Sequence, residues 1–379
     1  MFEFATAGRI IFGRETLGEL APAAVTFGRR TVVVTGRSIE RAGPVLELLK
    51  KGGVEARTFS VSGEPSIPAI QEGVGQAREF DAEFVIGFGG GSAIDAAKAV
   101  AALLTNPGDV FDYLEVVGKA QPLKHHPLPC VAIPTTAGTG AEVTRNAVLL
   151  SPGHRVKVSL RHPMMLPRLA IVDPALTDSL PPSLTASTGL DALTQLIEPY
   201  VSARANPLSD SICIEGMNRA RSLRRAYAND PAARDDMCVS SLFGGMALAN
   251  AGLGAVHGFA APIGGMFDAP HGAVCAALLP HAMEINLRAL RQRGPAGIAQ
   301  RFEDVARILT DDLQARPEEG IAWVTALCRD LQIPGLRTYG ITEEHADELC
   351  DKASVSSSIK ANPVTLTKEQ LRELVVKAL

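Results

Sequence analysis

The stretch Phe84-Val-Ile-Gly-Phe-Gly-Gly-Gly-Ser-Ala-Ile-Asp-Ala-Ala-Lys98 decides the fold of this chain. Its apolar start, Phe84–Phe88, is typical of a buried parallel strand, and Ala93–Leu104 follows it as a helix. Glycines at such a junction let the backbone approach a ligand, and the helix start offers free N–H groups and the positive end of its dipole. The pattern is not GxGxxG, so a tight turn without a ligand stays open. Its context favours a phosphate-binding loop at Gly89, Gly90, Gly91 and Ser92.

Strands and helices alternate on both sides of this loop. The strands are expected at Arg30–Thr35, Val54–Ser60, Pro129–Ile133 and Leu169–Val172, with a short strand pair within residues 1–13. Helices are expected at Leu17–Ala24, Ala42–Lys51 and Ile67–Arg78. This alternation predicts a Rossmann-like α/β domain with a parallel, helix-covered sheet.

Beyond residue 180 the strand signal disappears, and long segments rich in Ala, Leu, Met and Glu follow. Helices are expected at Ser183–Ser202, Pro207–Ala228, Asp235–Met266, His271–Leu290, Gly297–Thr310, Pro317–Leu331, Thr342–Ser354 and Thr367–Leu379. The chain is therefore expected to contain an α/β nucleotide-binding domain, residues 1–180, and an all-α domain, residues 181–379, which suits the length of 379 residues.

Composition narrows the class of protein. The chain is 46% hydrophobic and 21% charged with a net charge of −4, and no dense basic cluster suggests nucleic acid or an anionic membrane as a partner. There is no signal-peptide pattern and no uncharged apolar run long enough to span a membrane. Six cysteines, among them Cys275, show no CxxC pairing and mostly lie in apolar runs, which favours buried free thiols in a cytoplasmic protein.

Two further turns follow predicted strands. One contains Thr135, Thr136 and Thr139, and ligands bind at the ends of parallel strands in such sheets. The other is Gly36-Arg37-Ser38, at a place where NAD-preferring sites usually carry a carboxylate for the ribose hydroxyls. Arginine and serine are able to hold a 2′-phosphate instead, which makes the expected cofactor NAD(P) with tolerance of NADP. A solvent-facing arginine is the alternative.

A metal-type cluster lies in the predicted helical domain. Asp191 and Gln195 are four residues apart and share one helix face, while His257 and His271 stand among glycines and small residues. A carboxylate and two imidazoles are usual ligands of zinc or ferrous iron, whereas glutamine is a poor ligand. Taken singly, each residue has an ordinary structural explanation, so the residues alone leave the metal site and a purely structural role equally open.

Four ordered motifs connect these features. They are Gly89-Gly-Gly-Ser92-x-x-Asp95-x-x-Lys98, Pro134-Thr-Thr-Ala-Gly-Thr-Gly-Ala-Glu142-Val-Thr144, Gly189-Leu-Asp191-Ala-Leu-Thr-Gln195-x-Ile-Glu198, and the pair Val-His257-Gly and Pro270-His271-Gly with histidines 14 residues apart. The motifs resemble the iron-containing (group III) alcohol dehydrogenase family, and the resemblance covers nearly the whole chain.

The resemblance implies a dehydroquinate synthase-like architecture, with a cleft between a nucleotide-binding and a helical metal domain. It also implies interconversion of an alcohol with an aldehyde or ketone by NAD(P)(H), and often a homodimer or larger assembly. Residue-wise carry-over puts Asp191, His257 and His271 on metal ligands and Lys157 near the nicotinamide ribose. The cofactor contacts that it implies are Gly90, Gly91, Ser92, Asp95, Thr135, Thr139 and the motif residue Thr144.

The chain departs from the family pattern at three places. The family's histidine ligand is Gln195, a further family histidine near the substrate is Ala261, and the carboxylate of NAD-preferring members is Gly36. Gln195 is still able to bond the substrate oxygen or a water, so it stays a candidate catalytic and metal-site residue beside His257 and His271. The expected ion is Fe or Zn, and weak or absent binding stays open.

Three functions are therefore considered for a small alcohol or carbonyl substrate. The first is a metal-assisted NAD(P)-dependent dehydrogenase, in which the ion acts as a Lewis acid. The second is a metal-independent reductase like maleylacetate reductase, in which His257, His271 and Lys157 polarise the carbonyl. The third is a dehydroquinate synthase-like lyase, which needs a cationic pocket that the metal segments do not offer.

Overall fold

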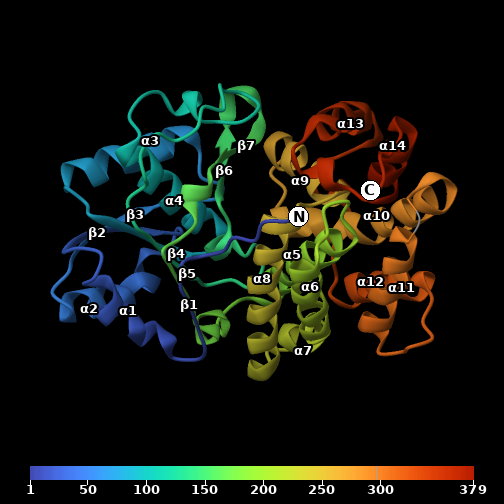
Figure 1. The fold of residues 1–379 in the computed structure, drawn as a ribbon, viewed down its shortest axis with the longest axis horizontal. Helices are drawn as coiled ribbons and strands as arrows, with labels where there is room; N and C mark the ends of the chain where they lie inside the picture. Colours follow the sequence, from blue (N-terminus) through green and yellow to red (C-terminus); the bar gives the residue numbers. More distant parts are fainter. Residues whose placement is uncertain (296) are drawn as a thin grey trace. The chain divides into compact units, whose positions relative to one another are not determined.

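A computed structural model describes residues 1–295 and 297–379, which form two compact units (Figure 1). The α/β unit contains Thr6–Thr136 and Gly140–Ser179, and the helical unit contains Met1–Ala5, Ala137–Thr139 and Leu180–Leu379. The α/β and helical character of the two parts is as predicted. The predicted domains, residues 1–180 and 181–379, imply that each part folds on its own, and this stays a prediction.

The α/β unit is built on a parallel sheet of six strands in the order β1-β8-β5-β4-β2-β3. Their bounds are β1 (Ile10–Phe12), β2 (Arg30–Thr35), β3 (Glu55–Ser60), β4 (Phe84–Gly89), β5 (Cys130–Pro134) and β8 (Leu169–Val172). The helices around the sheet are α1 (Leu20–Ala24), α2 (Gly43–Lys51), α3 (Ile67–Glu79) and α4 (Gly91–Thr105).

Both faces of the sheet are covered, which explains why its central strands read as unbroken apolar runs. On β2, Val32 and Val34 belong to the core that includes α3 and α4. Between them, Val33 faces the opposite way, into the core that includes α1 and α2. Figure 1 shows these two helix pairs on opposite sides of the sheet. The alternation of side chains along a strand therefore divides the unit into three layers.

Glycines bring β4 and α4 unusually close together. A Cβ on Gly87 would lie 2.9 Å from the Cα of Ile94, and one on Gly89 would lie 2.7 Å from the Cβ of Ala93. Gly89 also has a φ of +155°, which other residues rarely adopt. The strand therefore turns directly into the helix, and the loop backbone stays uncovered by side chains of its own.

Two features of the α/β unit differ from the prediction. No strand pair occurs in residues 1–13; only β1 forms, parallel to β8. The chain before it is held instead by Asn250, whose side chain bonds the backbone N–H and C=O of Ala5. The second difference is an antiparallel hairpin of β6 (Asn146–Ser151) and β7 (Val156–Arg161), which was not predicted. Its alternate apolar residues, such as Leu149 and Val158, pack into the core beside α4.

A buried lysine fastens this hairpin region to α4. The Nζ of Lys98 lies 2.9 Å from Asp95 Oδ1 and donates to the carbonyl of Ala141 and to the hydroxyl of Thr144, both at 2.9 Å. Asp95 Oδ2 in turn accepts from the backbone N–H of Val148 on β6, at 2.9 Å. Because Lys98 is only 1% exposed, these partners replace the water that its ammonium group would otherwise bind.

The helical unit contains ten α-helices among its described residues. They are α5 (Pro182–Val201), α6 (Pro207–Ala220), α7 (Leu223–Tyr227), α8 (Pro231–Ala251), α9 (Ala255–Met266), α10 (His271–Arg293), α11 (Ile298–Thr310), α12 (Pro317–Asp330), α13 (Ala346–Val355) and α14 (Lys368–Lys377). Two predicted helices are each divided in two. The break between α8 and α9 falls at Gly252, whose φ is +75°.

Helix α5 is the centre of this unit and packs against α6, α8 and α10. Nearly all of its residues from Thr185 to Val201 are buried, including the charged Asp191 and Glu198. A helix that is buried all round must satisfy its polar side chains with partners from neighbouring helices. The partners of Asp191 and Glu198 therefore locate the candidate site described below.

Among the described residues no single helix is long and apolar enough to cross a membrane. The consecutive helices α8 and α9 together meet the criteria of length and composition, but they are bent by 101° where they meet.

Replacing Lys98 by an apolar residue tests whether its buried contacts stabilise the packing of the hairpin region on α4. We expect Lys98→Met to lower the free energy of unfolding by about 3–5 kcal/mol, because it leaves the buried Asp95 carboxylate without its cation. Adding Asp95→Asn should recover part of this loss. The exposed ion pair of Lys119 is the control, and Lys119→Met should cost less than about 1 kcal/mol. Equal effects of the two lysine variants in urea unfolding would contradict the assignment.

The buried carboxyl of Glu142 makes stability depend on pH. Burial raises its pKa from 4.5 to about 7, against the opposing effects of its own backbone N–H and of Lys98. The folded chain therefore holds this proton more tightly than the unfolded chain, and the associated stability is lost as pH rises from 4.5 through about 7. At about pH 8, Glu142→Gln should be more stable than the parent by up to about 3 kcal/mol. Melting temperatures across pH measure this, with the exposed Glu47→Gln as control.

Candidate metal centre and nucleotide loop

Four ligand-type side chains meet in the helical unit. Asp191 lies on α5, His257 lies in the first turn of α9, and His271 is the first residue of α10. Cys275 follows one turn later on α10, so it lies on the same helix face as His271. One ligand atom from each lies within 4.8 Å of all the others. The structure thus brings together three of the predicted residues and adds a cysteine.

The contacts within this cluster converge on Asp191 and Cys275. Asp191 Oδ1 lies 3.3 Å from Nε2 of His257 and 3.7 Å from Nε2 of His271. The Sγ of Cys275 lies 3.8 Å from the same nitrogen of His257 and 3.7 Å from that of His271. The cluster is mostly enclosed: Asp191, His257 and Cys275 are buried, and the His271 side chain is 31% exposed.

The ring of His257 is oriented by a second carboxylate. Its Nδ1 lies 2.7 Å from Glu198 Oε2, while Glu198 Oε1 accepts the backbone N–H of Val256 at 2.8 Å. A proton on Nδ1 donated to Glu198 leaves the lone pair of Nε2 facing Asp191 and Cys275. Metal-binding histidines are commonly oriented in this way by a carboxylate behind the ring.

A glycine allows Glu198 to reach this position. Gly254 begins the turn into α9, and a Cβ there would lie 2.7 Å from Glu198 Oε1 and 2.8 Å from Asn362 Oδ1. Gly254, one of the glycines near His257 to which the sequence gave no definite role, therefore has a steric reason. It lets the Glu198 carboxylate, which orients the imidazole, pack against the start of α9.

The charged groups of the cluster strongly affect one another's pKa values. Burial raises the pKa of Asp191, but His271 and His257 together outweigh it and hold this pKa below its usual value. Burial lowers the pKa of His257, yet the Cys275 sulfur, Asp191 and Glu198 raise it well above the ordinary value. The pKa of His271 is likewise raised, against its burial, by Cys275 and Asp191. The cluster therefore stabilises positive charge at its centre.

This donor set suits a divalent metal ion. Asp191 Oδ1 is buried and has no hydrogen-bond partner, although Nε2 atoms of two imidazoles lie close by. A buried carboxylate oxygen without a hydrogen bond is costly, and a cation in contact with it would remove that cost. Carboxylate, imidazole and thiolate are all ligands of zinc, and the first two also of iron.

Gln195 and Ala261 are the two positions near these residues at which the chain departs from the family pattern, and they differ in the atoms that they offer to the site. Gln195 is 2% exposed, and its Oε1 has no hydrogen-bond partner. The amide packs against α8, where a Cβ on Gly244 would lie 3.3 Å from Oε1. Ala261, on α9, has only a methyl group and offers no ligand atom.

Sequence reasoning missed Cys275 as a member of this cluster. It was grouped with the other cysteines as a buried thiol in an apolar run, and it is indeed buried. The available signal was its spacing of four residues from His271 on a predicted helix, which places the two side chains on one face.

The predicted phosphate loop lies at the carboxyl ends of neighbouring strands. Gly89 ends β4, Gly90 caps α4 without a side chain, and Gly91 and Ser92 begin the helix. The carbonyl of Gly89 accepts the N–H of Thr135, which follows β5, at 2.8 Å. Strand register places the ends of β2, β4 and β5 beside one another. Free backbone at a helix start on this edge is suited to a pyrophosphate.

Two more predicted residues lie at this edge. A Cβ on Gly90 would lie 3.3 Å from Oγ1 of Thr136, and one on Gly89 would lie 3.5 Å from the backbone nitrogen of Gly36. A Cβ on Gly36 itself would meet nothing within 4 Å, so there is open space where NAD-preferring sites carry a carboxylate. Arg37 and Ser38 are exposed, and Nε of Arg37 donates to Ser62 Oγ at 3.2 Å.

The remaining predicted cofactor residues have protein partners or are grouped with the other unit, and their contacts with a cofactor stay predictions. Asp95 and Thr144 both bond Lys98, and Lys157 on β7 is buried with its Nζ 2.7 Å from Glu64 Oε1. Thr139 belongs to the short segment grouped with the helical unit.

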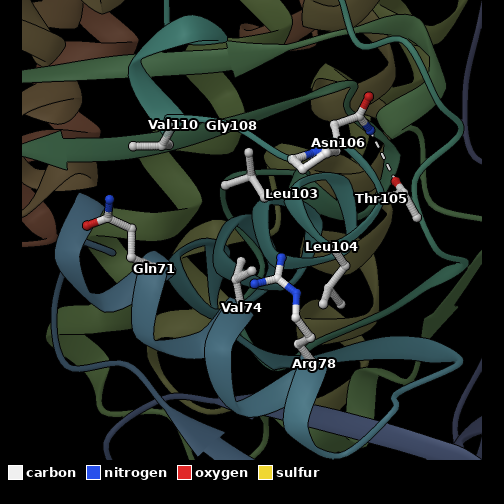
Figure 2. Close-up of a pocket in the computed structure, with 10 residues that line it drawn as sticks. Gln71, Val74, Arg78, Leu103, Leu104, Thr105, Asn106, Gly108 and Val110 are labelled. Atoms are coloured by element: carbon white, nitrogen blue, oxygen red, sulfur yellow. Dashed lines mark hydrogen bonds between the residues drawn. The ribbon is translucent and has the colours of Figure 1, made fainter.

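A separate pocket of about 600 Å³ lies at the far end of α4. Figure 2 shows its wall, formed by α3 and by the end of α4 with the turn that follows. Helix α4 has 15 residues, so this pocket is about 20 Å from the phosphate loop along the helix axis. It contains no metal-type cluster among its lining residues, which are Gln71, Val74, Arg78, Leu103, Leu104, Thr105, Asn106, Pro107, Gly108 and Val110.

Comparison with known proteins identifies relatives of both units. The family model of iron-containing alcohol dehydrogenase matches residues 7–174, and the model of the C-terminal part of the Fe-containing alcohol dehydrogenase family matches residues 185–379. Alcohol dehydrogenase 4 of Saccharomyces cerevisiae (strain ATCC 204508 / S288c) is 36% identical over 359 residues, covering 92% of this chain and 91% of that protein.

Two further similarities extend along nearly the whole chain. Lactaldehyde reductase of Escherichia coli (strain K12) is 32% identical over 375 residues, covering 96% of both proteins. The structure of an alcohol dehydrogenase from Oenococcus oeni superposes with a TM-score of 0.92 at 34% identity, covering 100% of both chains. The resemblance read from the sequence motifs and the predicted fold class are thereby confirmed. This chain belongs to the iron-containing alcohol dehydrogenase family.

Proposed function

We propose that Asp191, His257 and His271 hold a divalent metal ion at the reaction centre of this enzyme. Membership of the family makes the chain an NAD(H)-dependent alcohol dehydrogenase or carbonyl reductase, and the family implies a divalent metal. The observation that carries the ligand assignment is Asp191 Oδ1, which is buried without a hydrogen bond and lies 3.3 and 3.7 Å from the two Nε2 atoms.

The residues around the centre have separable tasks. A bound ion supplies Lewis-acid polarisation of the substrate oxygen, and NAD(H) gives or takes the hydride. Glu198 keeps a proton on Nδ1 of His257 and so fixes which nitrogen faces the centre. His271 has the most exposed side chain of the cluster, so its side is the one from which a small substrate approaches.

The two alternative functions have less support. A metal-independent reductase would need free donors, but Lys157 is paired with Glu64, and His257 lies between Glu198 and Asp191. A dehydroquinate synthase-like lyase would need a cationic pocket, whereas the described cluster contributes a carboxylate and a thiol beside its imidazoles. The proposed substrate is a short alcohol or aldehyde, in keeping with the relative named for lactaldehyde.

We also propose that the nucleotide site accepts NADPH as well as NADH. The support is the open space at Gly36, where a carboxylate would repel a 2′-phosphate, together with the exposed Arg37 and Ser38 that follow it. A guanidinium group is a strong partner for a phosphate, because it donates two parallel hydrogen bonds.

Removing the buried carboxylate tests the metal assignment. Asp191→Ala should reduce bound metal to a small fraction of one equivalent and lower kcat/KM for short-chain aldehydes by about 10²–10³, since the ion supplies several kcal/mol of transition-state stabilisation. Metal content after purification without chelator and turnover of a panel of short aldehydes and alcohols are the measurements. Asp351→Ala, at an exposed position on α13, is the control. Full activity of metal-free parent enzyme would instead support the metal-independent reductase.

The cofactor proposal is tested at Arg37. Arg37→Ala should weaken NADPH binding by about tenfold while changing NADH binding much less, because only NADPH has the 2′-phosphate. Dissociation constants from nucleotide fluorescence titration give both numbers. Arg78→Ala, at the opposite end of α3 from the loop, is the matched control. Equal weakening of both nucleotides would rule out a 2′-phosphate contact at Arg37.

A further inference from the structure

Cys275 differs from an ordinary buried thiol in what its sulfur faces. It is 0% exposed, and its Sγ lies 3.7 and 3.8 Å from Nε2 of His271 and His257, the nitrogens proposed to bind the ion. Asp191, whose Oδ1 has no hydrogen-bond partner, completes the group of four. A thiol packed only as a small apolar group would have no reason to point at three ligand atoms.

We infer that the Cys275 thiolate is a fourth protein ligand of the metal ion, in a chain whose residue 195 is glutamine. This inference rests on the proposed function, because it requires that Asp191, His257 and His271 bind an ion. It assigns to this chain a carboxylate, two imidazoles and a thiolate, in place of a carboxylate and three imidazoles.

The spacing of the four atoms supports a common ion. Zinc binds nitrogen and oxygen at about 2.0–2.2 Å and sulfur at about 2.3 Å, so the ligands of a tetrahedral site are about 3.3–3.8 Å apart. Four of the separations in the cluster are 3.3, 3.7, 3.7 and 3.8 Å. The remaining separations are also within 4.8 Å, so the sulfur is within reach of a position where it would be the fourth ligand of a shared ion.

Gln195 is a weaker candidate for the fourth ligand than Cys275. Its side chain is packed against Gly244 of α8, and an amide oxygen is a weak ligand beside thiolate and imidazole. Cys275 reaches the cluster from α10 instead, one helical turn after His271. A ligand lost from α5 is thus replaced by one from a neighbouring helix.

Charge balance points the same way. On binding, the Cys275 thiol releases its proton to solvent and forms a metal–sulfur bond, with no change in oxidation state. A divalent ion with the Asp191 carboxylate and this thiolate is neutral overall, which lowers the cost of holding the ion in a largely buried site. Thiolate is a soft ligand, so the set favours zinc over ferrous iron.

Cobalt substitution reports the sulfur directly. The Co²⁺-loaded parent enzyme should show the near-ultraviolet charge-transfer band of a thiolate–cobalt bond, and Cys275→Ser should lose it. The same variant should bind Zn²⁺ at least about 100-fold more weakly, as expected for a ligand compared with a residue that only orients one. Cys213→Ser, another fully buried thiol of the helical unit, should keep both band and affinity.

The outcomes separate this inference from the function on which it rests. A parent enzyme that binds one equivalent of Co²⁺ without the band, and without a sulfur neighbour at about 2.3 Å in X-ray absorption of the zinc form, would overturn the inference alone. A parent enzyme that binds no ion would overturn the proposed metal centre as well. The double variant Gln195→His/Cys275→Ala should bind the ion without the band, which shows that loss of signal does not reflect misfolding.

Discussion

The structure of the helical unit depends on how it satisfies the buried imidazole of His257. The ring lies between two carboxylates, with Glu198 at Nδ1 and Asp191 facing Nε2, and each belongs to α5. Burying the imidazole is tolerable because each of its nitrogens faces a carboxylate, so the contacts of His257 with α5 and the chemistry of the site have one cause. The same contact explains why residue 254 is glycine, since any side chain there would displace Glu198.

The α/β unit also has to satisfy a buried charged side chain, that of Lys98. Lys98 is buried in α4, and its partners come from the same helix and from the segment leading to β6. Lys98 holds the hairpin beside α4, the helix whose N-terminus forms part of the phosphate loop. Asp95 and Thr144, which family motifs associate with the cofactor, are the groups that neutralise and hydrogen-bond this lysine. A motif residue is thus able to support the phosphate loop indirectly, by holding in place α4, the helix at whose start the loop lies.

Much of the fold was predictable because its signals are local. Apolar runs such as Phe84–Phe88 and the glycines after them determine strand, turn and helix within a few residues, and the alternation of strands and helices predicts a parallel sheet. The order of the strands within that sheet was not predicted. The hairpin of β6 and β7 was missed because its alternation is short and one of its faces packs on α4. At the site, Asp191, His257 and His271 were found through motifs. Cys275 was not, since a cysteine in an apolar run looks the same whether its sulfur faces a leucine or an imidazole.

The proposed ligands come from three helices, which would give a bound ion a second role. Asp191, His257, His271 and Cys275 come from α5, α9 and α10, which the unfolded chain does not hold together. An ion that binds only this assembled set stabilises the folded chain by mass action, by about 2.7 kcal/mol when free metal is 100 times its dissociation constant. If the proposed centre binds its ion, the heat resistance of the enzyme would vary with the supply of that metal, and a shortage of it would lower the amount of folded protein as well as turnover.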